Sequence, residues 1–173
     1  KSINSKTGDM VQTWILRDDI SPLDAIASGA DKSICGNCAH RGRKGKKRTC
    51  YVDMGKSPTS IWHAYHRGQY LDLSNDPHTI AYLINDRIVR MGAYGDPAMV
   101  PVKRWRMLLA AAAGRTGYTH AWRRMWAQAL KPYVMASVDS VAEQDLARAM
   151  GWRTFRVRTG TEPLQSNEFP CPA

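Results

Sequence analysis

Three cysteines lie close together in the segment ICGNCAHRGRKGKKRTCYV, residues 34–52. Cys35 and Cys38 form a C-x2-C pair, and Cys50 follows on the far side of a basic run. A C-x2-C pair lets two thiolates reach one ion or cluster, and a third thiolate so close indicates metal ligation. Three clustered thiols without a metal would be prone to oxidation. The spacing therefore predicts a metal centre on these three cysteines.

This spacing leaves the metal and its fourth ligand open. Structural zinc needs four ligands in a closed tetrahedron, and the candidates for the fourth are His40 and Cys171. An iron–sulfur cluster also takes thiolates, and ligation by three cysteines would leave one iron open for chemistry. We therefore expect either an iron–sulfur cluster or zinc.

A run of cations separates Cys38 from Cys50. Its members are Arg41, Arg43, Lys44, Lys46, Lys47 and Arg48. They would offset the negative charge of a thiolate centre and lower the pKa values of the thiols. The whole chain has a formal net charge of +10 and a pI near 9.7, an excess that favours an anionic partner. We expect a nucleic acid or nucleotide to contact the run, although a merely solvated basic loop is the simpler alternative.

The bulk properties indicate one globular domain over residues 1–173. Hydrophobic residues make up 43% of the chain, and its longest apolar run is too short to span a membrane. Clustered metal-type cysteines and the lack of a visible signal peptide favour a reducing compartment, the cytoplasm. No feature of the sequence indicates a particular protein partner.

Strand-like and helix-like segments alternate along the chain. Strands are predicted at 11–17, 87–95, 117–122, 133–140 and 153–159, and helices at 21–27, 57–68, 76–84, 101–114, 125–130 and 141–150. This alternation is typical of βα units around a parallel sheet. We expect an α/β core over 10–160, folded as a partial TIM-type barrel of about five or six strands. A cysteine-rich basic loop at 31–56 is inserted in it, and an irregular, truncated tail follows from 160 to 173.

Polar residues follow four of the predicted strands. Parallel α/β folds place their active groups at the carboxyl ends of the strands, so these residues should face one mouth. They are Gly95, Asp96 and Pro97, then Thr119 and His120, then Ser137 and Asp139, and finally Arg156 and Arg158. We take Asp96, His120 and Asp139 as candidate catalytic residues, and the two arginines as candidate phosphate contacts.

Each candidate also has a plainer structural explanation. Asp139 could cap the following helix, because Asp-Ser before an apolar-periodic run is a cap signature. Asp96 could be a turn residue, and His120 could be a core histidine. Arg156 and Arg158 share a strand face by the period of two, and a solvated face explains them nearly as well as phosphate binding does.

The order of these features resembles that of the radical S-adenosylmethionine (radical SAM) enzymes. Those enzymes have a partial or full βα barrel, with three cluster cysteines in the loop after the first strand. Their second strand ends in a Gly-Gly-Glu-Pro-like motif, and IVRMGAYGDP is similar, with Gly95, Asp96 and Pro97 at the matching places. Their fourth strand often reads Ser-hydrophobic-Asp, and ASVDS is similar, with Ser137 and Asp139 matching.

The resemblance implies an iron–sulfur cluster with S-adenosylmethionine, whose pocket these five matching residues would line. The cysteine spacing differs, C-x2-C-x11-C here against C-x3-C-x2-C there. The chain also resembles an uncharacterised family of phage-encoded proteins with a similar cysteine loop, a GDP-like motif and a Cys-Pro-Ala tail. In that family further cysteines follow the tail, which implies that Cys171 belongs to a second cluster and that the protein acts in the host cytoplasm.

Three functions fit these observations. The first is a radical SAM-like enzyme that acts on a nucleic acid or nucleotide. The second keeps a structural zinc and makes Asp96 or Asp139 the nucleophile or base in chemistry on a nucleobase. The third is a zinc-stapled nucleic-acid-binding module without catalysis. In that module bases would stack on tryptophans, for which the candidates are Trp62, Trp105, Trp122, Trp126 and Trp152.

Overall fold

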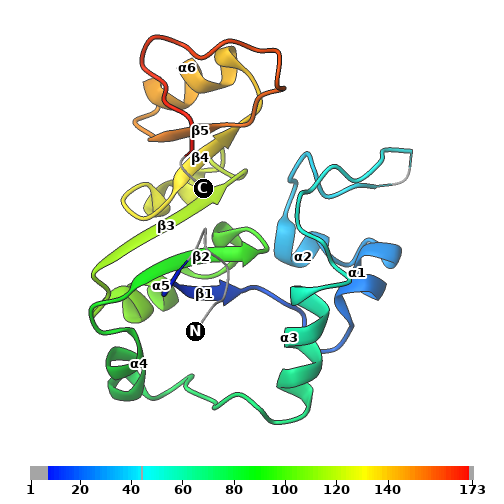
Figure 1. Ribbon diagram of the computed structural model, residues 1–173, viewed down its shortest axis with the longest axis vertical. Coiled ribbons are helices and arrows are strands. Elements are labelled where there is room, and N and C mark those ends of the chain that lie inside the picture. Colours follow the sequence, from blue (N-terminus) through cyan, green and yellow to red (C-terminus); the bar gives the residue numbers. More distant parts are fainter. Residues whose placement is uncertain (1–7, 44, 172–173) are drawn as a thin grey trace.

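Five parallel strands form one open sheet in the computed structural model, which describes residues 8–43 and 45–171 (Figure 1). The strands are β1 (Val11–Trp14), β2 (Ile88–Tyr94), β3 (Gly114–Thr119), β4 (Met135–Val138) and β5 (Thr154–Arg156). Each strand pairs with the next one in sequence, so the order across the sheet is β1-β2-β3-β4-β5. The predicted α/β class with parallel strands is therefore confirmed, and the sheet does not close on itself within the described residues.

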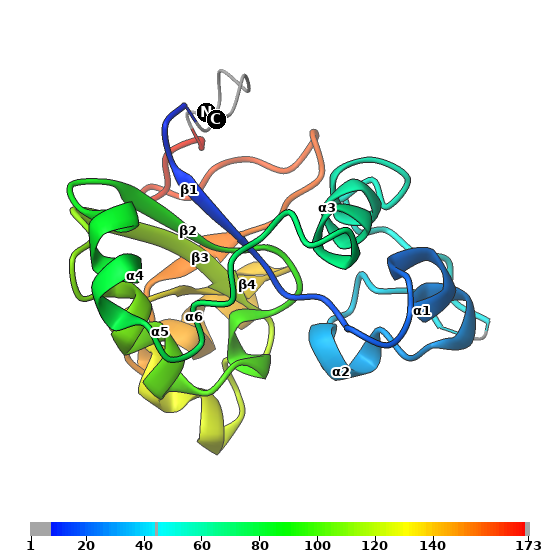
Figure 2. The same ribbon diagram turned by 90° about the horizontal axis from the view of Figure 1, so that it is seen from below.

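Helices surround the sheet in two groups. Those that cover one face of the sheet are α4 (Pro77–Ile84), α5 (Val102–Leu109) and α6 (Val141–Ala149), as Figure 2 shows. Those that lie beyond the carboxyl end of β1 are α1 (Pro22–Ser28), α2 (Lys32–Cys35) and α3 (Ser57–His66). Two short 3-10 helices, η1 (Pro97–Met99) and η2 (Met125–Leu130), follow β2 and β3. The second group thus carries the cysteine loop to the carboxyl edge of the sheet.

The cap signals in the sequence set where several helices begin. The Ser21 hydroxyl accepts a hydrogen bond from the Asp24 backbone N–H at 3.3 Å, and proline follows at the first helical position of α1. The Asp76 carboxylate likewise accepts from the Thr79 N–H at 2.9 Å at the start of α4. In both cases a side-chain oxygen satisfies a backbone donor that the first turn leaves open.

The main core lies between the sheet and its helices. It is built on alternate residues of the strands, among them Val89, Met91, Ala136 and Val138, which are at most 1% exposed. A second, smaller core joins Tyr94 at the end of β2 to the cysteine segment through Ile34, Cys35 and Met54. This second core is what fixes the cysteine loop against the sheet.

A bulge at the end of β2 shapes the carboxyl edge. The register of β1 against β2 shifts between Gln12 and Trp14, and Gly92 has a φ of 71°. The Thr13 hydroxyl accepts from the Gly92 N–H at 3.0 Å and donates to the Arg90 carbonyl at 3.0 Å, so one side chain satisfies groups that the bulge frees. The chain then turns sharply toward α2.

The structure corrects several predicted boundaries. β3 begins and ends three residues before the predicted 117–122, so that His120 comes directly after the strand. The predicted helix at 125–130 is the 3-10 helix η2, which has no side-chain cap and stops shortly before Pro132. The four-residue α2 was not predicted. Among the described residues no helix has the length and apolarity needed to cross a bilayer.

Candidate metal centre

The three clustered cysteines lie together at the carboxyl edge of the sheet. Cys35 ends α2 and is buried, whereas Cys38 and Cys50 are half-buried. The Cys38 N–H donates to the Cys35 carbonyl at 3.3 Å, and the Cys50 N–H donates at 3.0 Å to the carbonyl of His40, whose own N–H donates to the Cys38 sulfur. Asp96 at the end of β2 is also tied to this segment, because its N–H donates to the Ile34 carbonyl at 2.8 Å.

A closed loop returns the chain from Cys38 to Cys50. The carbonyl of His40 accepts two hydrogen bonds, from the N–H groups of Thr49 at 3.1 Å and Cys50 at 3.0 Å. These two hydrogen bonds therefore hold together the two ends of the loop that carries the basic run. The His40 N–H itself points back and donates to the Cys38 sulfur at 3.4 Å, a bond that favours the thiolate form.

Burial controls the protonation of the thiols. Desolvation raises the pKa of Cys35 to about 12, and the carboxylate of Asp31 adds to the rise. Burial also raises the pKa of Cys38 to about 11, although the hydrogen bond from the His40 backbone opposes this. A cation bound by these sulfurs would reverse the effect, because metal ligation requires and stabilises thiolates.

Unpaired polar atoms collect around the same cysteines. Within the described chain, six buried side-chain nitrogen or oxygen atoms have no hydrogen-bond partner. Three of them belong to Asp31, Arg48 and His120, and a fourth is the Tyr94 hydroxyl, which interacts with the Cys35 thiol. Buried polar groups are nearly always paired, so this concentration indicates that the site takes up a further group.

The three cysteines are not arranged for one tetrahedral zinc ion as they lie here. Zinc–sulfur bonds of about 2.3 Å place thiolates of one ion about 3.8 Å apart. Among the described residues, the three cysteines do not form a group whose ligand atoms all lie within 4.8 Å of one another. Ligation of one ion by all three would therefore require the sulfur atoms to move closer together.

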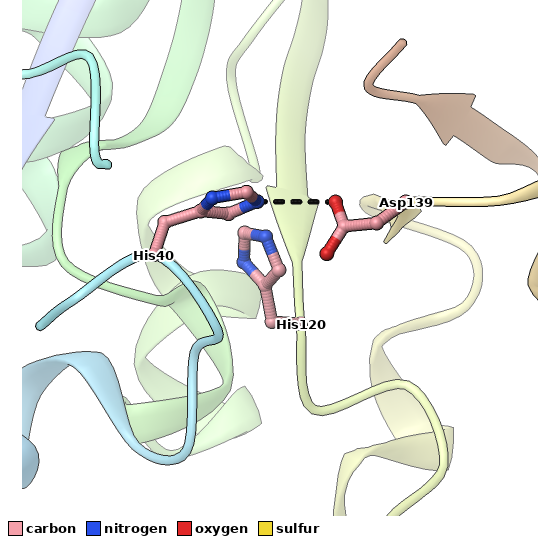
Figure 3. Close-up of side chains that lie close together, drawn as sticks. All are labelled: His40, His120 and Asp139. Carbon is pink, nitrogen blue, oxygen red and sulfur yellow. Dashed lines mark hydrogen bonds and ion pairs between the residues drawn. The ribbon is translucent and has the colours of Figure 1, made fainter. Parts of the chain in front are cut away.

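Two imidazoles and a carboxylate, from His40, His120 and Asp139, lie close together, as Figure 3 shows. His40 Nε2 lies 3.0 Å from Asp139 Oδ1, and His40 Nδ1 lies 2.8 Å from the Thr49 hydroxyl. The His120 ring packs edge-on against the His40 ring, with 5.4 Å between centroids. One ligand atom from each of the three residues lies within 4.8 Å of the other two. Burial lowers the pKa of His120, against the nearby carboxylates of Asp96 and Asp139, so its ring is neutral at pH 7.

Asp139 is free for this contact because other residues cap helix α6. The Ser140 hydroxyl accepts from the Glu143 N–H at 3.2 Å, and the Glu143 carboxylate accepts from the Asp139 N–H at 2.8 Å. This arrangement is a variant of the capping box. The plainer explanation of Asp139 as the cap is therefore wrong, and its carboxylate points to the loop instead.

Asp96 has both of its oxygens occupied by the fold. Oδ1 accepts from the Ala98 N–H at 2.9 Å and from the Thr119 hydroxyl at 2.7 Å, while Oδ2 accepts from the His120 N–H at 2.8 Å. The carboxylate is buried, 6% exposed, and joins the ends of β2 and β3. Asp96 therefore caps η1 and links the end of β2 to the end of β3.

The other residues matched to the cofactor motif are packed into the same edge. Pro97 is fully buried, and its carbonyl accepts from the Trp105 indole N–H at 2.8 Å. Ser137 is 5% exposed. Gly95 has a φ of 82°, and a Cβ there would lie 2.6 Å from the Ile15 Cβ, so only glycine fits. These residues shape the edge rather than present free polar groups.

The basic run divides into exposed and engaged side chains. Arg43, Lys46 and Lys47 are exposed, and Lys44 lies outside the described residues. Arg41 is largely buried against Asp31, with 2.5 Å between Nη2 and Oδ1. Arg48 donates to the Arg41 carbonyl at 3.4 Å and lies near Tyr94. Arg41 therefore serves the packing of the loop and not the expected phosphate contact.

Arg156 holds the C-terminal tail instead of a phosphate. Its guanidinium is 3% exposed and pairs with Glu168 at 2.7 Å and Glu162 at 2.8 Å. Arg158 remains exposed and donates to the Glu162 carbonyl. The candidate contact on Arg156 is thereby corrected, because two carboxylates already satisfy it.

Cys171 lies in the C-terminal tail, near β3. It is exposed, and its charge acts on the Tyr118 hydroxyl in β3. Of the two candidates for a fourth ligand, His40 contacts Cys38 and Cys50 through its backbone, whereas no described hydrogen bond joins Cys171 to these residues.

Two cavities flank the paired imidazoles. One, of about 290 Å³, is lined by His40, Asp139, Lys46, Arg158 and Glu162, and so mixes both signs of charge. The other, of about 480 Å³, is lined by Lys32, Arg123, Arg124, Trp126 and His120. It also touches Gly36 and Asn37, the two residues between Cys35 and Cys38. Both cavities therefore open at the candidate metal centre.

Comparisons with protein-family models, with curated proteins and with solved structures give no match to this chain.

Sequence reasoning did not find the pairing of His40 with Asp139. His40 was a candidate ligand and Asp139 a candidate base, but nothing in the sequence joins the two. Asp31 and Tyr94 were likewise not singled out. The one available signal was that the loop and the strand ends share an edge, which predicts proximity without naming pairs.

Proposed function

We propose that this chain holds an iron–sulfur cluster on Cys35, Cys38 and Cys50 and acts as a radical SAM-like enzyme on a nucleic acid or nucleotide. The observation that supports this most is the convergence of three thiols and the unpaired polar atoms of Asp31, Arg48 and His120 at the carboxyl edge of a sequentially ordered parallel sheet. Such an edge is where βα folds place their chemistry. The open sheet is compatible with a partial TIM-type barrel.

The residues present fit such a cluster. Their sulfur donors are the type that clusters take, and three of them lie in one segment of 16 residues. Arg48 supplies a cation close to the buried pair of Tyr94 and Cys35, where thiolate charge would accumulate. Three cysteines leave one iron for a further ligand. A bound cluster would supply an electron for the cleavage of S-adenosylmethionine.

The smaller cavity suits the charged groups of that cofactor. S-adenosylmethionine carries an ammonium, a carboxylate and a sulfonium group, so its pocket should offer both signs of charge. Asp139 and Glu162, and the cations Lys46 and Arg158, all line this cavity. Its volume of about 290 Å³ is close to the lower end of the range for small-molecule sites. Asp139 would bind and orient the cofactor there.

A second candidate function rests on the spacing of His40, His120 and Asp139. Two imidazoles and a carboxylate are a common set of zinc ligands, and here their atoms already lie within 4.8 Å of one another. In that case the chain would be a zinc-dependent nucleic-acid protein with its metal on this group. Asp139 would then be a ligand of the metal.

Metal analysis of two variants separates the candidates. The chain, Cys38→Ser and Asp139→Asn are purified anaerobically, and iron, sulfide and zinc are measured together with the visible absorption. For the cluster, Cys38→Ser loses iron and Asp139→Asn keeps it. Zinc that survives Cys38→Ser but not Asp139→Asn would overturn the first proposal and favour the second.

The cluster-loaded chain is then tested with a reductant for cleavage of S-adenosylmethionine. Cys171→Ser is the matched control, because this cysteine is exposed and acts on Tyr118 instead of the other thiols. Full iron with no cleavage would contradict the enzymatic part of the proposal.

A further inference from the structure

The larger cavity beside the candidate centre is cationic. Lys32, Arg123 and Arg124 line it, and no carboxylate is among the described side chains that do so. Arg123 is partly neutralised by Glu143 at 2.9 Å, whereas Lys32 and Arg124 are exposed. A cavity with this charge attracts phosphate and repels a sulfonium cation. It is therefore unlike the mixed-charge cavity on the other side of His40.

An exposed indole forms one wall of this cavity. Trp126 is 59% exposed, whereas Trp105, Trp122 and Trp152 are at most 4% exposed in the core. The Trp62 indole N–H donates to the Arg17 carbonyl at 2.9 Å, away from the cavity. Of the five tryptophans considered for base stacking, Trp126 is thus the one that the structure presents to a ligand beside cations.

The placement of Trp126 follows from the short helix that carries it. η2 begins directly after the turn that bears Arg123 and Arg124, so cations and indole are held within four residues. Arg123 is fixed by its stack on the buried Trp122 ring, 4.0 Å from the centroid. The turn is therefore anchored in the core while its polar face stays open.

We propose that this cavity binds single-stranded nucleic acid, with phosphates on Lys32 and Arg124 and one base stacked on Trp126. Sequence-tolerant binding of single strands combines a cationic groove with an aromatic platform, and both are present here. The bound strand would pass His120 and the turn between Cys35 and Cys38. This inference rests on the proposed function, since it names the substrate class of the same edge.

Binding of labelled oligonucleotides tests the inference. Fluorescence anisotropy is measured anaerobically on the chain with and without reconstituted iron, using single-stranded DNA, single-stranded RNA and duplex DNA. The variants are Trp126→Ala, Trp126→Phe and Arg124→Ala. Tyr82→Ala, 83% exposed on α4, and Arg67→Ala, exposed at the end of α3, remove a matched aromatic ring and a matched charge elsewhere.

We expect Trp126→Ala to weaken single-strand binding roughly tenfold to a hundredfold, while Trp126→Phe keeps it within about threefold, because any flat ring supports stacking. Arg124→Ala should lower the salt dependence of log K by about 0.7 per lost phosphate contact. The Tyr82 and Arg67 variants should bind as the parent chain does.

Four results would overturn the inference. The first is that Trp126→Ala binds single strands as tightly as Tyr82→Ala does. The second is that Trp126→Phe loses as much affinity as Trp126→Ala. The third is that S-adenosylmethionine displaces the oligonucleotide competitively. Preferred binding of duplex that ignores Trp126 would also exclude it. A chain without iron that still depends on Trp126 would sustain the inference and contradict only the proposed reaction.

Discussion

His40 Nε2 lies 3.0 Å from Asp139 Oδ1, although 99 positions separate the two residues in the chain. The contact joins the cysteine loop to the end of β4 and spans the smaller cavity. Both side chains remain partly exposed, at 25% and 36%, so the pair is better suited to meet a ligand than to hold the fold together.

Removal of this pair should affect function more than stability. We expect Asp139→Asn to change the free energy of unfolding by less than about 1 kcal/mol, as is typical of partly exposed ion pairs. If the proposed reaction holds, cleavage of S-adenosylmethionine should fall at least about tenfold, because the carboxylate that would orient the cofactor is lost. Urea unfolding and product formation measure the two effects. Asp145→Asn, exposed on α6, is the control, and equal activity of both variants would refute a role for Asp139.

Asp96 should behave in the opposite way. Asp96→Ala removes the acceptor for Ala98 N–H, the Thr119 hydroxyl and His120 N–H, all at a buried position. Stranded donors of this kind cost about 1–3 kcal/mol each, so we expect a loss of about 3 kcal/mol or more in the free energy of unfolding. Denaturant titration followed by tryptophan fluorescence gives the value. A variant as stable as Asp145→Ala would show that the observed bonds do not hold the edge together.

Gly95 should tolerate no side chain. In Gly95→Ala the new Cβ would lie 2.6 Å from the Ile15 Cβ and 3.1 Å from the Ile34 carbonyl oxygen, at a φ of 82°. Steric conflict and backbone strain together should lower the free energy of unfolding by about 2–4 kcal/mol. Gly160→Ala is the matched control, since nothing lies within 4 Å of its Cβ position. Equal unfolding midpoints would mean that the turn after β2 can relax.

The tail should detach in acid. Hydrogen bonds from the Arg156 guanidinium lower the pKa of Glu168 to about 2. A lowered carboxyl pKa stabilises the folded tail above the ordinary value near about 4.3, and the contribution fades as the pH falls through about 2. Glu168→Gln should therefore differ most from the parent chain at pH 5–8 and converge with it in acid. The stability of the tail is measured by proteolysis near neutral pH and by unfolding titrations at lower pH. A stability difference between Glu168→Gln and the parent chain that grows in acid would contradict the prediction.

The sequence predicted the alternation of elements well because its signals are local. Serine or aspartate before proline marks the start of a helix, and the first residues of α1, α3 and α4 lie within one or two positions of the predicted ones. Parallel pairing followed from the alternation itself. β3 was predicted three residues too late because Gly114 does not look like the first residue of a strand. Gly117 lies inside the strand, where a Cβ would collide with Met91.

Contacts between distant segments could not be predicted in the same way. Arg156 has the periodicity of a basic strand face, but Glu162 and Glu168 reach it only once the tail folds back. Asp139 has the neighbours of a cap, but Ser140 and Glu143 take over that task. Which of two adjacent polar residues caps a helix, or pairs with a distant side chain, depends on the tertiary structure. A single sequence does not contain this information in a local pattern.

The two hydrogen bonds on the His40 carbonyl have a consequence for how cysteine spacing is compared between proteins. Residues 41–48 leave the site and return to it, so they add length to the chain between Cys38 and Cys50 without adding distance. A protein with a shorter excursion could place its third sulfur at the same point. The number of residues between two cysteines then reflects the length of a surface loop, which can grow or shrink while the two sulfur positions stay the same.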